Sequence, residues 1–160
     1  SGYGTSLFKG QPVTLNTNGT IVTAAGAADI LGILAGVEFV DANGKPNLQP
    51  NWLAGQTIPT GGFAYAWVYD DPDIIFRVQA NGPIPQTAIG DQADAGDISV
   101  GSAQTGLSKS YLGALVGAGN QGQFRVVAFD LAPDNAPGDA YTVVQVQLAR
   151  SQYVANKVAI

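Results

Sequence analysis

The chain has 160 residues, of which 46% are hydrophobic and 12% are charged, and it carries a formal net charge of −5. This length suits one domain with a buried core, and the hydrophobicity excludes intrinsic disorder. The acidic balance, without any cluster of Lys and Arg, argues against direct binding to nucleic acid, and no run of about eighteen apolar residues predicts a membrane span. So little charge is typical of a protein whose surface binds a partner.

The first predicted element is a β-hairpin over residues 11–24 (QPVTLNTNGTIVTA). Val13 and Leu15 share one face of its first strand, and the pair Asn18-Gly19 supplies a turn that favours positive φ. A turn of this kind fixes the pairing of the two strands that flank it.

A nearly continuous apolar run follows over residues 30–40 (ILGILAGVEFV). Its length and its β-branched residues predict a strand that is buried on both faces, in which Gly32 and Gly36 mark bends or the close approach of another backbone. A buried helix is the alternative, and the two glycines disfavour it. Residues 41–47 (DANGKPN) then form a turn.

Residues 50–62 are expected to form a loop anchored by Trp52. Two alternating segments follow, over residues 63–69 (FAYAWVY) and 74–80 (IIFRVQA), and the four residues between them, Asp-Asp-Pro-Asp, are typical of a turn. The two segments are therefore predicted to pair with each other, as the clearest hairpin in the chain.

Four aromatic side chains share one face of the first of these segments: Phe63, Tyr65, Trp67 and Tyr69. Aromatic residues in this pattern are expected to belong to the core and to pair across strands. A platform on which sugars stack is the alternative interpretation of the same face.

Residues 81–122 are rich in Gly, Ala, Asp, Ser and Gln. This composition predicts an extended loop with short strands, in which the stretch 85–94 is compatible with a turn or two of helix. Strands return over residues 123–130 and 141–151. The end of the chain, residues 151–160, is predicted to be an arm that packs on a neighbouring molecule.

Together these elements predict an all-β fold, a compact β-barrel or β-sandwich of roughly seven to ten short strands. The fold contains a long Gly/Ala-rich loop and little helix. The whole chain, residues 1–160, is expected to form a single β-rich domain.

The chain contains no His and no Cys, and these are the residue types on which many catalytic sites depend. Their absence excludes Ser-His-Asp and Cys-His machinery and argues against a zinc site. We therefore expect no catalytic, cofactor-binding or metal-binding residues and no enzymatic activity. Asp70, Asp71 and Asp73 offer oxygen atoms that suit Ca²⁺, but no calcium loop ending in Glu surrounds them, and a plain turn is favoured.

A second acidic group, Asp91, Asp94 and Asp97, recurs at a spacing of three residues. On a helix these side chains would share a face, but the Ala and Gly residues between them favour a solvated loop. The segment 117–122 (GAGNQG) resembles a phosphate-binding loop, but it lacks the Lys-Ser/Thr that follows in such loops.

Two arginines are candidates for ion pairs. Arg77 is expected to pair with an aspartate across the turn or across a subunit interface. Arg77 or Arg125 of a neighbouring copy is also a candidate partner for the aspartates of the Asp-Asp-Pro-Asp turn.

The order of several short segments carries a resemblance that spans residues 1–148. The segments are residues 1–47, 67–82 (WVYDDPDIIFRVQANG), 89–94 (IGDQAD), 106–112 (GLSKSYL) and 125–148. In this order they resemble a set of small virion proteins encoded near the capsid gene of tailed bacteriophages, the head decoration or cement proteins.

The resemblance implies a β-rich domain that binds the outer surface of the capsid and stabilises the expanded head by bridging capsomers. Its partner would be the major capsid protein, and it would form a homo-oligomer, with a trimer favoured and a dimer as the alternative. The family supplies no catalytic residues. Other interpretations are another phage structural subunit, such as a minor capsid or tail-tube protein, and a carbohydrate-binding module.

Overall fold

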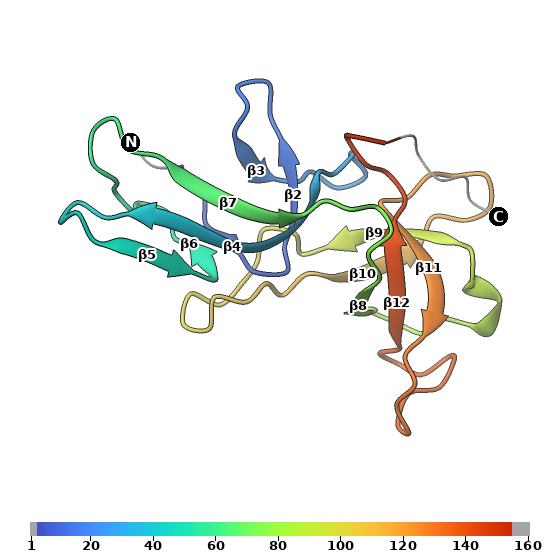
Figure 1. Ribbon diagram of the computed structural model, residues 1–160. Helices are drawn as coiled ribbons and strands as arrows, with labels where there is room; N and C mark the ends of the chain where they lie inside the picture. Colours follow the sequence, from blue (N-terminus) through green and yellow to red (C-terminus); the bar gives the residue numbers. More distant parts are fainter. Residues whose placement is uncertain (1–2, 155–160) are drawn as a thin grey trace.

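Figure 1 shows the computed structural model, which describes residues 3–154. The described chain is almost entirely β-structure in three antiparallel sheets, which confirms the all-β prediction. These sheets form no closed barrel, so the sandwich is the closer of the two predicted architectures. The described residues contain a single short 3₁₀-helix, η1, which covers Gln86–Ala88. No helix in the described part is long and apolar enough to cross a membrane.

The strands fall into an N-terminal and a C-terminal group. The N-terminal strands are β1 (Leu7–Phe8), β2 (Pro12–Leu15), β3 (Ile21–Thr23), β4 (Gly32–Val40), β5 (Pro46–Gln49), β6 (Asn51–Trp52) and β7 (Ala64–Tyr69). The C-terminal strands are β8 (Phe76–Gln79), β9 (Gln92–Gly96), β10 (Tyr111–Leu115), β11 (Phe124–Phe129) and β12 (Val143–Leu148).

The N-terminal sheet is built around β4. Strand β2 pairs with the beginning of β4 and β5 with its end, whereas β7 runs along the opposite edge of β4. The predicted hairpin is present as β2–β3, and Gly19 in its turn has φ of 72°. The predicted turn after β4 is also present, and Gly44 within it has φ of 80°. Both turns therefore use glycine where other side chains are strained.

Strand β4 confirms the predicted close backbone approaches, but the prediction of burial on both faces holds only for its first half, because Glu38 and Val40 are exposed. Ile33 and Leu34 are buried, and a Cβ atom added at Gly32 would lie 2.2 Å from the carbonyl oxygen of Tyr69. A Cβ atom at Gly36 would lie 3.0 Å from the carbonyl oxygen of Gln49. The two glycines therefore let two neighbouring strands approach β4 closely, β7 through the backbone of Tyr69 and β5 through the backbone of Gln49.

The hairpin predicted between residues 63–69 and 74–80 does not form. Strand β7 pairs with β4, β8 pairs with β12, and residues 70–75 carry the chain from one sheet to the other (Figure 1). The segment does turn locally, since Oδ1 of Asp71 accepts a hydrogen bond from the Asp73 backbone N–H at 2.8 Å. However, none of its residues adopts the positive φ that tight hairpin turns use.

Residues 81–122, predicted as an extended loop with short strands, contain the short strands β9 and β10, and β9 is a more central element than the prediction implied. The C-terminal sheet has the order β10-β9-β11-β12-β8, so β9 lies inside the sheet between two partners. Residues 92–94 belong to β9, and the expected helix is limited to η1. Small residues are needed there because neighbours approach closely: a Cβ atom at Gly96 would lie 2.2 Å from the ring of Tyr111.

Two apolar clusters form the core of the described residues, and the second is shared between the halves. The first cluster consists of buried N-terminal residues: Leu7, Val13, Leu34, Val37, Phe39 and Trp52. The second lies against the C-terminal sheet and includes Val126, Val144 and Leu148, but Ile30 and Ile33 of the N-terminal half also belong to it.

Buried polar contacts complete the junction between the halves. Gln123 is fully buried; its Nε2 donates to the carbonyl oxygens of Ala25 and Ala28, each at 3.0 Å, and its Oε1 accepts from the Ala95 N–H at 3.1 Å. Because these bonds join residues 25 and 28 of the N-terminal half to the C-terminal sheet, the buried Gln123 side chain helps to fix how the two halves meet.

The first residues of the predicted C-terminal arm contact their own chain. Ser151 forms a parallel bridge with Ile30, and the Gln152 side chain bonds both the N–H and the carbonyl oxygen of Leu15, at 2.7 and 3.0 Å. The remainder of the predicted arm, residues 155–160, lies outside the described residues.

Candidate binding surface

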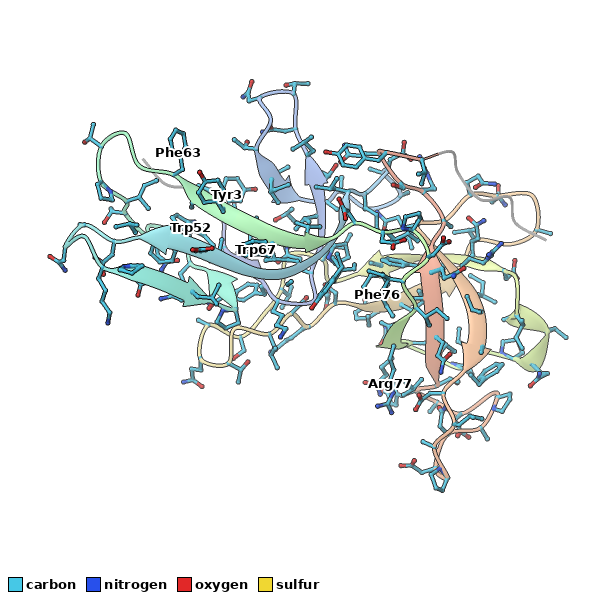
Figure 2. All side chains as sticks on the ribbon, in the orientation of Figure 1. Tyr3, Trp52, Phe63, Trp67, Phe76 and Arg77 are labelled. Carbon is cyan, nitrogen blue, oxygen red and sulfur yellow. The ribbon has the colours of Figure 1, made fainter. Side chains whose placement is uncertain are left out.

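The aromatic row on β7 faces solvent, so the prediction that it belongs to the core is wrong. The four side chains, of which Phe63 directly precedes β7, are between 48% and 73% exposed: Phe63, Tyr65, Trp67 and Tyr69. Figure 2 labels Phe63 and Trp67. The opposite face of β7 packs on the first core cluster through Ala66 and Val68. The sequence singled out these four residues but assigned them to the wrong side of the sheet.

The reason lies in what already fills the space beneath β7. Phe39 and Trp52 meet edge to face there, with ring centroids 5.4 Å apart, and both are buried. Ala66 and Val68 of β7 pack against this cluster. Trp52 also confirms its predicted role as an anchor, because its Nε1 donates to the carbonyl oxygen of Tyr3 at 2.8 Å.

The exposed apolar surface continues from β7 across β4 and β5. Glu38 of β4 lies opposite Tyr65 on one side and opposite Leu48 on the other, and Leu48 is 75% exposed. We call this surface the aromatic face, and it comprises Val40, Leu48, Phe63, Tyr65, Trp67 and Tyr69.

Trp67 stands at the centre of the aromatic face between two hollows. One hollow, of about 440 Å³, is lined by Lys9, Gly36, Leu48 and Pro50 among others. The other, of about 370 Å³, lies between Glu38, Tyr65 and Trp67. Trp67 lies opposite Gly36 in the pairing of β7 with β4, so its side chain stands beside a position that has none.

The acidic residues of the connection between β7 and β8 form no metal site. No group of three or more His, Cys, Asp or Glu side chains that could hold a metal ion occurs within residues 3–154. Asp71 instead caps the local turn through its bond to the Asp73 N–H. The turn interpretation therefore describes Asp71, although the turn joins two sheets instead of closing a hairpin.

The second acidic group lies along β9, which neither the loop nor the helix interpretation anticipated. Asp94 is within the strand, and its Oδ1 accepts from the backbone N–H of Gln123 at 3.0 Å. Asp91 precedes the strand, and Asp97 follows it with φ of 47°. Asp91, Asp94 and Asp97 thus lie before, within and after the strand, and they do not gather into a group that could hold a metal ion within the described part of the chain.

The glycine-rich segment 117–122 connects β10 to β11. Asn120 Nδ2 closes it by donating to the carbonyl oxygen of Val116 at 2.9 Å. A phosphate-binding loop leads into a helix N-terminus, whereas this segment leads into a strand. The segment therefore acts as a turn.

The arginines make contacts within the chain. Arg77 pairs at 2.7 Å with Asp130 of its own chain, which follows β11, so this partner is neither an aspartate of the turn that precedes β8 nor one across a subunit interface. Arg125 donates from Nη2 to Oε1 of Gln147 at 3.2 Å. The first contact links β8 to the loop that follows β11, and the second links the paired strands β11 and β12.

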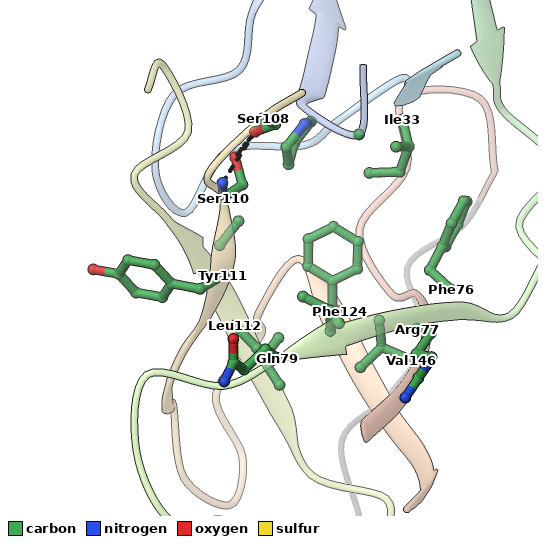
Figure 3. Close-up of a pocket in the computed structure, with 14 residues that line it drawn as sticks. Ile33, Phe76, Arg77, Gln79, Ser108, Ser110, Tyr111, Leu112, Phe124 and Val146 are labelled. Carbon is green, nitrogen blue, oxygen red and sulfur yellow. Dashed lines mark hydrogen bonds between the residues drawn. The ribbon is translucent and has the colours of Figure 1, made fainter. Parts of the chain in front are cut away.

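A cavity of about 310 Å³ lies where the two halves meet (Figure 3). Its wall is mostly apolar, with Phe76, Leu112 and Phe124, and the hydroxyl groups of Ser108 and Ser110 are hydrogen-bonded to each other at 2.7 Å. No acid–base pair converges on it. Its lining comes from segments far apart in the chain, which is why sequence reasoning did not find it.

No protein-family model matches this chain, and no curated protein and no solved structure shows significant similarity to it.

Proposed function

We propose that this protein is a structural protein of the virion that binds the outer surface of a tailed-bacteriophage capsid. In this proposal it forms a homo-oligomer, contacts the major capsid protein and stabilises the expanded head by bridging capsomers. The observation that carries the proposal is the aromatic face, a broad and nearly uncharged apolar surface of the kind that one of the two protein contacts in this proposal, to another copy or to the capsid, would cover. The order of the short segments described above, which resembles decoration proteins, points the same way.

The size and shape of the aromatic face favour a macromolecular partner. Aromatic side chains present about 150–250 Å² each, so the exposed parts of the four on β7 amount to roughly 500 Å². That lies near the upper end of the largest apolar patch on an ordinary monomer, about 300–600 Å², and such patches are often functional. The surface is also a sheet face, not an enclosed pocket of the kind that small ligands occupy.

A bridging protein needs a second contact surface, and the loop between β11 and β12 offers one. Leu131 is 98% exposed and Tyr141 is also exposed. In Figure 1 this loop extends below the C-terminal sheet, far from β7 at the upper left. Binding that occurs only on the expanded shell stabilises that shell by linkage, and repeated copies on a symmetric lattice add avidity.

The proposal is tested by adding purified protein to expanded heads of the encoding phage from which it has been stripped. We expect saturable binding and a higher temperature of genome release, measured by DNA-dye fluorescence. The paired change Leu131→Ser with Tyr141→Ser should weaken binding to heads. Tyr153→Ser, an exposed apolar residue elsewhere, is the matched control. Absence of binding to expanded heads, or binding without any gain in heat resistance, contradicts the proposal.

Carbohydrate binding is a second candidate, because Tyr65, Trp67 and Tyr69 present exposed rings with polar tips along one strand. Such rings stack on sugars while their polar atoms stay hydrated. Binding on a glycan array that Trp67→Ala abolishes, with folding intact, would support this function. Unassisted assembly of the purified protein into tubes or shells would instead favour a tail-tube or minor capsid subunit.

A further inference from the structure

We propose that the aromatic face is the docking site of a second copy of this chain, related to the first by a two-fold axis. In this dimer Trp67 of each copy enters the hollow beside Gly36 of the other. The inference rests on the homo-oligomer of the proposed function, names the surface that forms it, and assigns a dimer in place of the trimer.

The shape of the aromatic face is complementary to itself. Trp67 is 57% exposed and projects from the face, whereas the hollow next to it has a floor at Gly36, where no side chain rises. Backbone, not a flexible side chain, closes that floor, since a Cβ atom at Gly36 would already lie 3.0 Å from the carbonyl oxygen of Gln49. A projection beside a hollow on one surface is what a two-fold interface requires.

The charges around Trp67 are also complementary to themselves. Glu38 lines the hollow on one side of Trp67, and Lys9 lines the hollow on the other. The ion pairs of residues 3–154 are Arg77–Asp130 and Arg150–Asp29, so Glu38 and Lys9 form no ion pair with each other within one copy. A two-fold axis near Trp67 places Glu38 of each copy toward Lys9 of the other.

The area of the aromatic face fits a weak dimer that a lattice can reinforce. Roughly 500 Å² from each copy gives about 1,000 Å² in total, which reaches the lower bound for a specific interface. Contact with a partner would also shield apolar surface from solvent, because residues 63–69 carry no charge. The outer edge of β7 has no partner strand in the described part of the chain. Uncovered edges of this composition promote unspecific association, whereas a defined dimer shields the face.

Charge reversal tests the proposal on the purified full chain without heads. The dimer dissociation constant of the wild type and of Glu38→Lys, Lys9→Glu and the double variant is measured by sedimentation equilibrium. Each single variant should weaken the dimer at least about tenfold, because like charges then face each other across the axis. The double variant should recover to within about threefold of the wild type. A monomer at all concentrations, a trimer, or a double variant without recovery overturns the proposal.

Tryptophan fluorescence gives an independent readout. Trp52 is buried and Trp67 is exposed, so Trp52→Phe leaves Trp67 as the single reporter. Acrylamide should quench Trp67 less as protein concentration rises through the dissociation constant. Quenching that does not change with concentration contradicts docking at this face.

A truncation and a control complete the design. Trp67→Ala should weaken the dimer at least about tenfold, as truncation of a central aromatic residue does at other interfaces. Leu131→Ser, at the far loop, should leave the dimer intact. Because no heads are present, failure here overturns the dimer and leaves the binding to heads to be judged by its own test, whereas failure of the wild type to bind heads overturns the proposed function and leaves the dimer standing.

Discussion

Strands β7 and β8 follow each other in the chain and have the same alternating pattern, yet they orient it oppositely. In β7 the large residues face solvent, as Trp67 does, and small residues face the core. In β8 the large residues Phe76 and Val78 pack against the second core cluster, and Arg77 points outward. Alternation therefore shows which residues share a face, but the layer beneath the strand decides which face is buried.

The packing beneath each strand explains the difference. The space under β7 is already occupied by Phe39 and Trp52, so Ala66 and Val68 suffice to close it. The second cluster leaves room for Phe76, which lines the cavity between the halves and meets Tyr69 edge to face at 6.4 Å.

The largest expected effect comes from comparing an inward aromatic residue with an outward one. Phe76→Ala should lower the free energy of unfolding by about 2–3 kcal/mol, somewhat less than truncation of a fully buried Phe, because Phe76 is only partly buried. Tyr65→Ala should change it by less than about 0.5 kcal/mol, as exposed substitutions usually do. Urea unfolding at a concentration that keeps the protein monomeric measures both values. Equal losses in the two variants would contradict the opposite orientation of β7 and β8.

The second prediction concerns the junction between the sheets that β7 and β8 join. Gln123→Ala removes part-buried hydrogen bonds to the Ala95 N–H and to the carbonyl oxygens of Ala25 and Ala28, although the Ala25 oxygen keeps its bond from the Ala28 N–H. Their loss should cost about 1–2 kcal/mol. Gln79→Ala, at an exposed position of β8, is the matched control and should be nearly neutral. Thermal and urea unfolding measure both, and a neutral Gln123→Ala would show that the junction does not depend on this side chain.

Local signals made part of this fold predictable. The β2–β3 hairpin follows from Asn18-Gly19, and β4 with its close approaches follows from an apolar run that contains Gly32 and Gly36. In each case the residues that determine the structure are neighbours in the sequence. Turn chemistry and burial pattern are therefore sufficient evidence for these elements.

The features that the sequence did not predict depend on contacts between segments that are far apart in the chain. Nothing near residues 70–73 shows that β7 pairs with β4 and β8 with β12. The small residues of β9 predict a loop from the sequence alone. The structure explains them, because the ring of Tyr111 lies where a side chain at Gly96 would be. The aromatic face likewise brings Lys9 and Leu48 to Trp67, and no spacing in the sequence relates them.

The third prediction tests the outward face of β8, which carries charge where β7 carries aromatic rings. Arg77 and Asp130 form an ion pair at 2.7 Å, with 64% of the Arg77 side chain exposed. A double-mutant cycle with Arg77→Gln and Asp130→Asn should give a coupling of about 0.5 kcal/mol, as for other exposed pairs. The coupling should decrease with added salt, because screening weakens it. A coupling that salt does not change would show that the contact is not electrostatic.

The smallest expected effect is on the pH dependence of stability, and it comes from one of two turns that both contain an aspartate. Asp71 bonds the Asp73 N–H in the crossover between β7 and β8, whereas Asp41 lies in a true hairpin turn between β4 and β5. The backbone N–H of Lys45 is the main cause that holds the pKa of Asp41 below its ordinary value of 3.8. Desolvation opposes this by raising the pKa of Asp41, and bonds from the Asn47 side chain and from the Asn43 N–H lower it further.

This lowered pKa gives Asp41 a stabilising effect with a defined pH dependence. The folded state binds a proton at Asp41 less readily than the unfolded state, so the contribution is complete above the unfolded pKa and disappears as pH falls through the folded pKa. Asp41→Asn keeps an oxygen acceptor for the turn but removes the charge. Its melting temperature should therefore lie slightly below that of the wild type at pH 7, and the difference should vanish at pH values below the ordinary range of aspartate. A difference of equal size at both pH values would mean that the charge of Asp41 does not stabilise the hairpin turn.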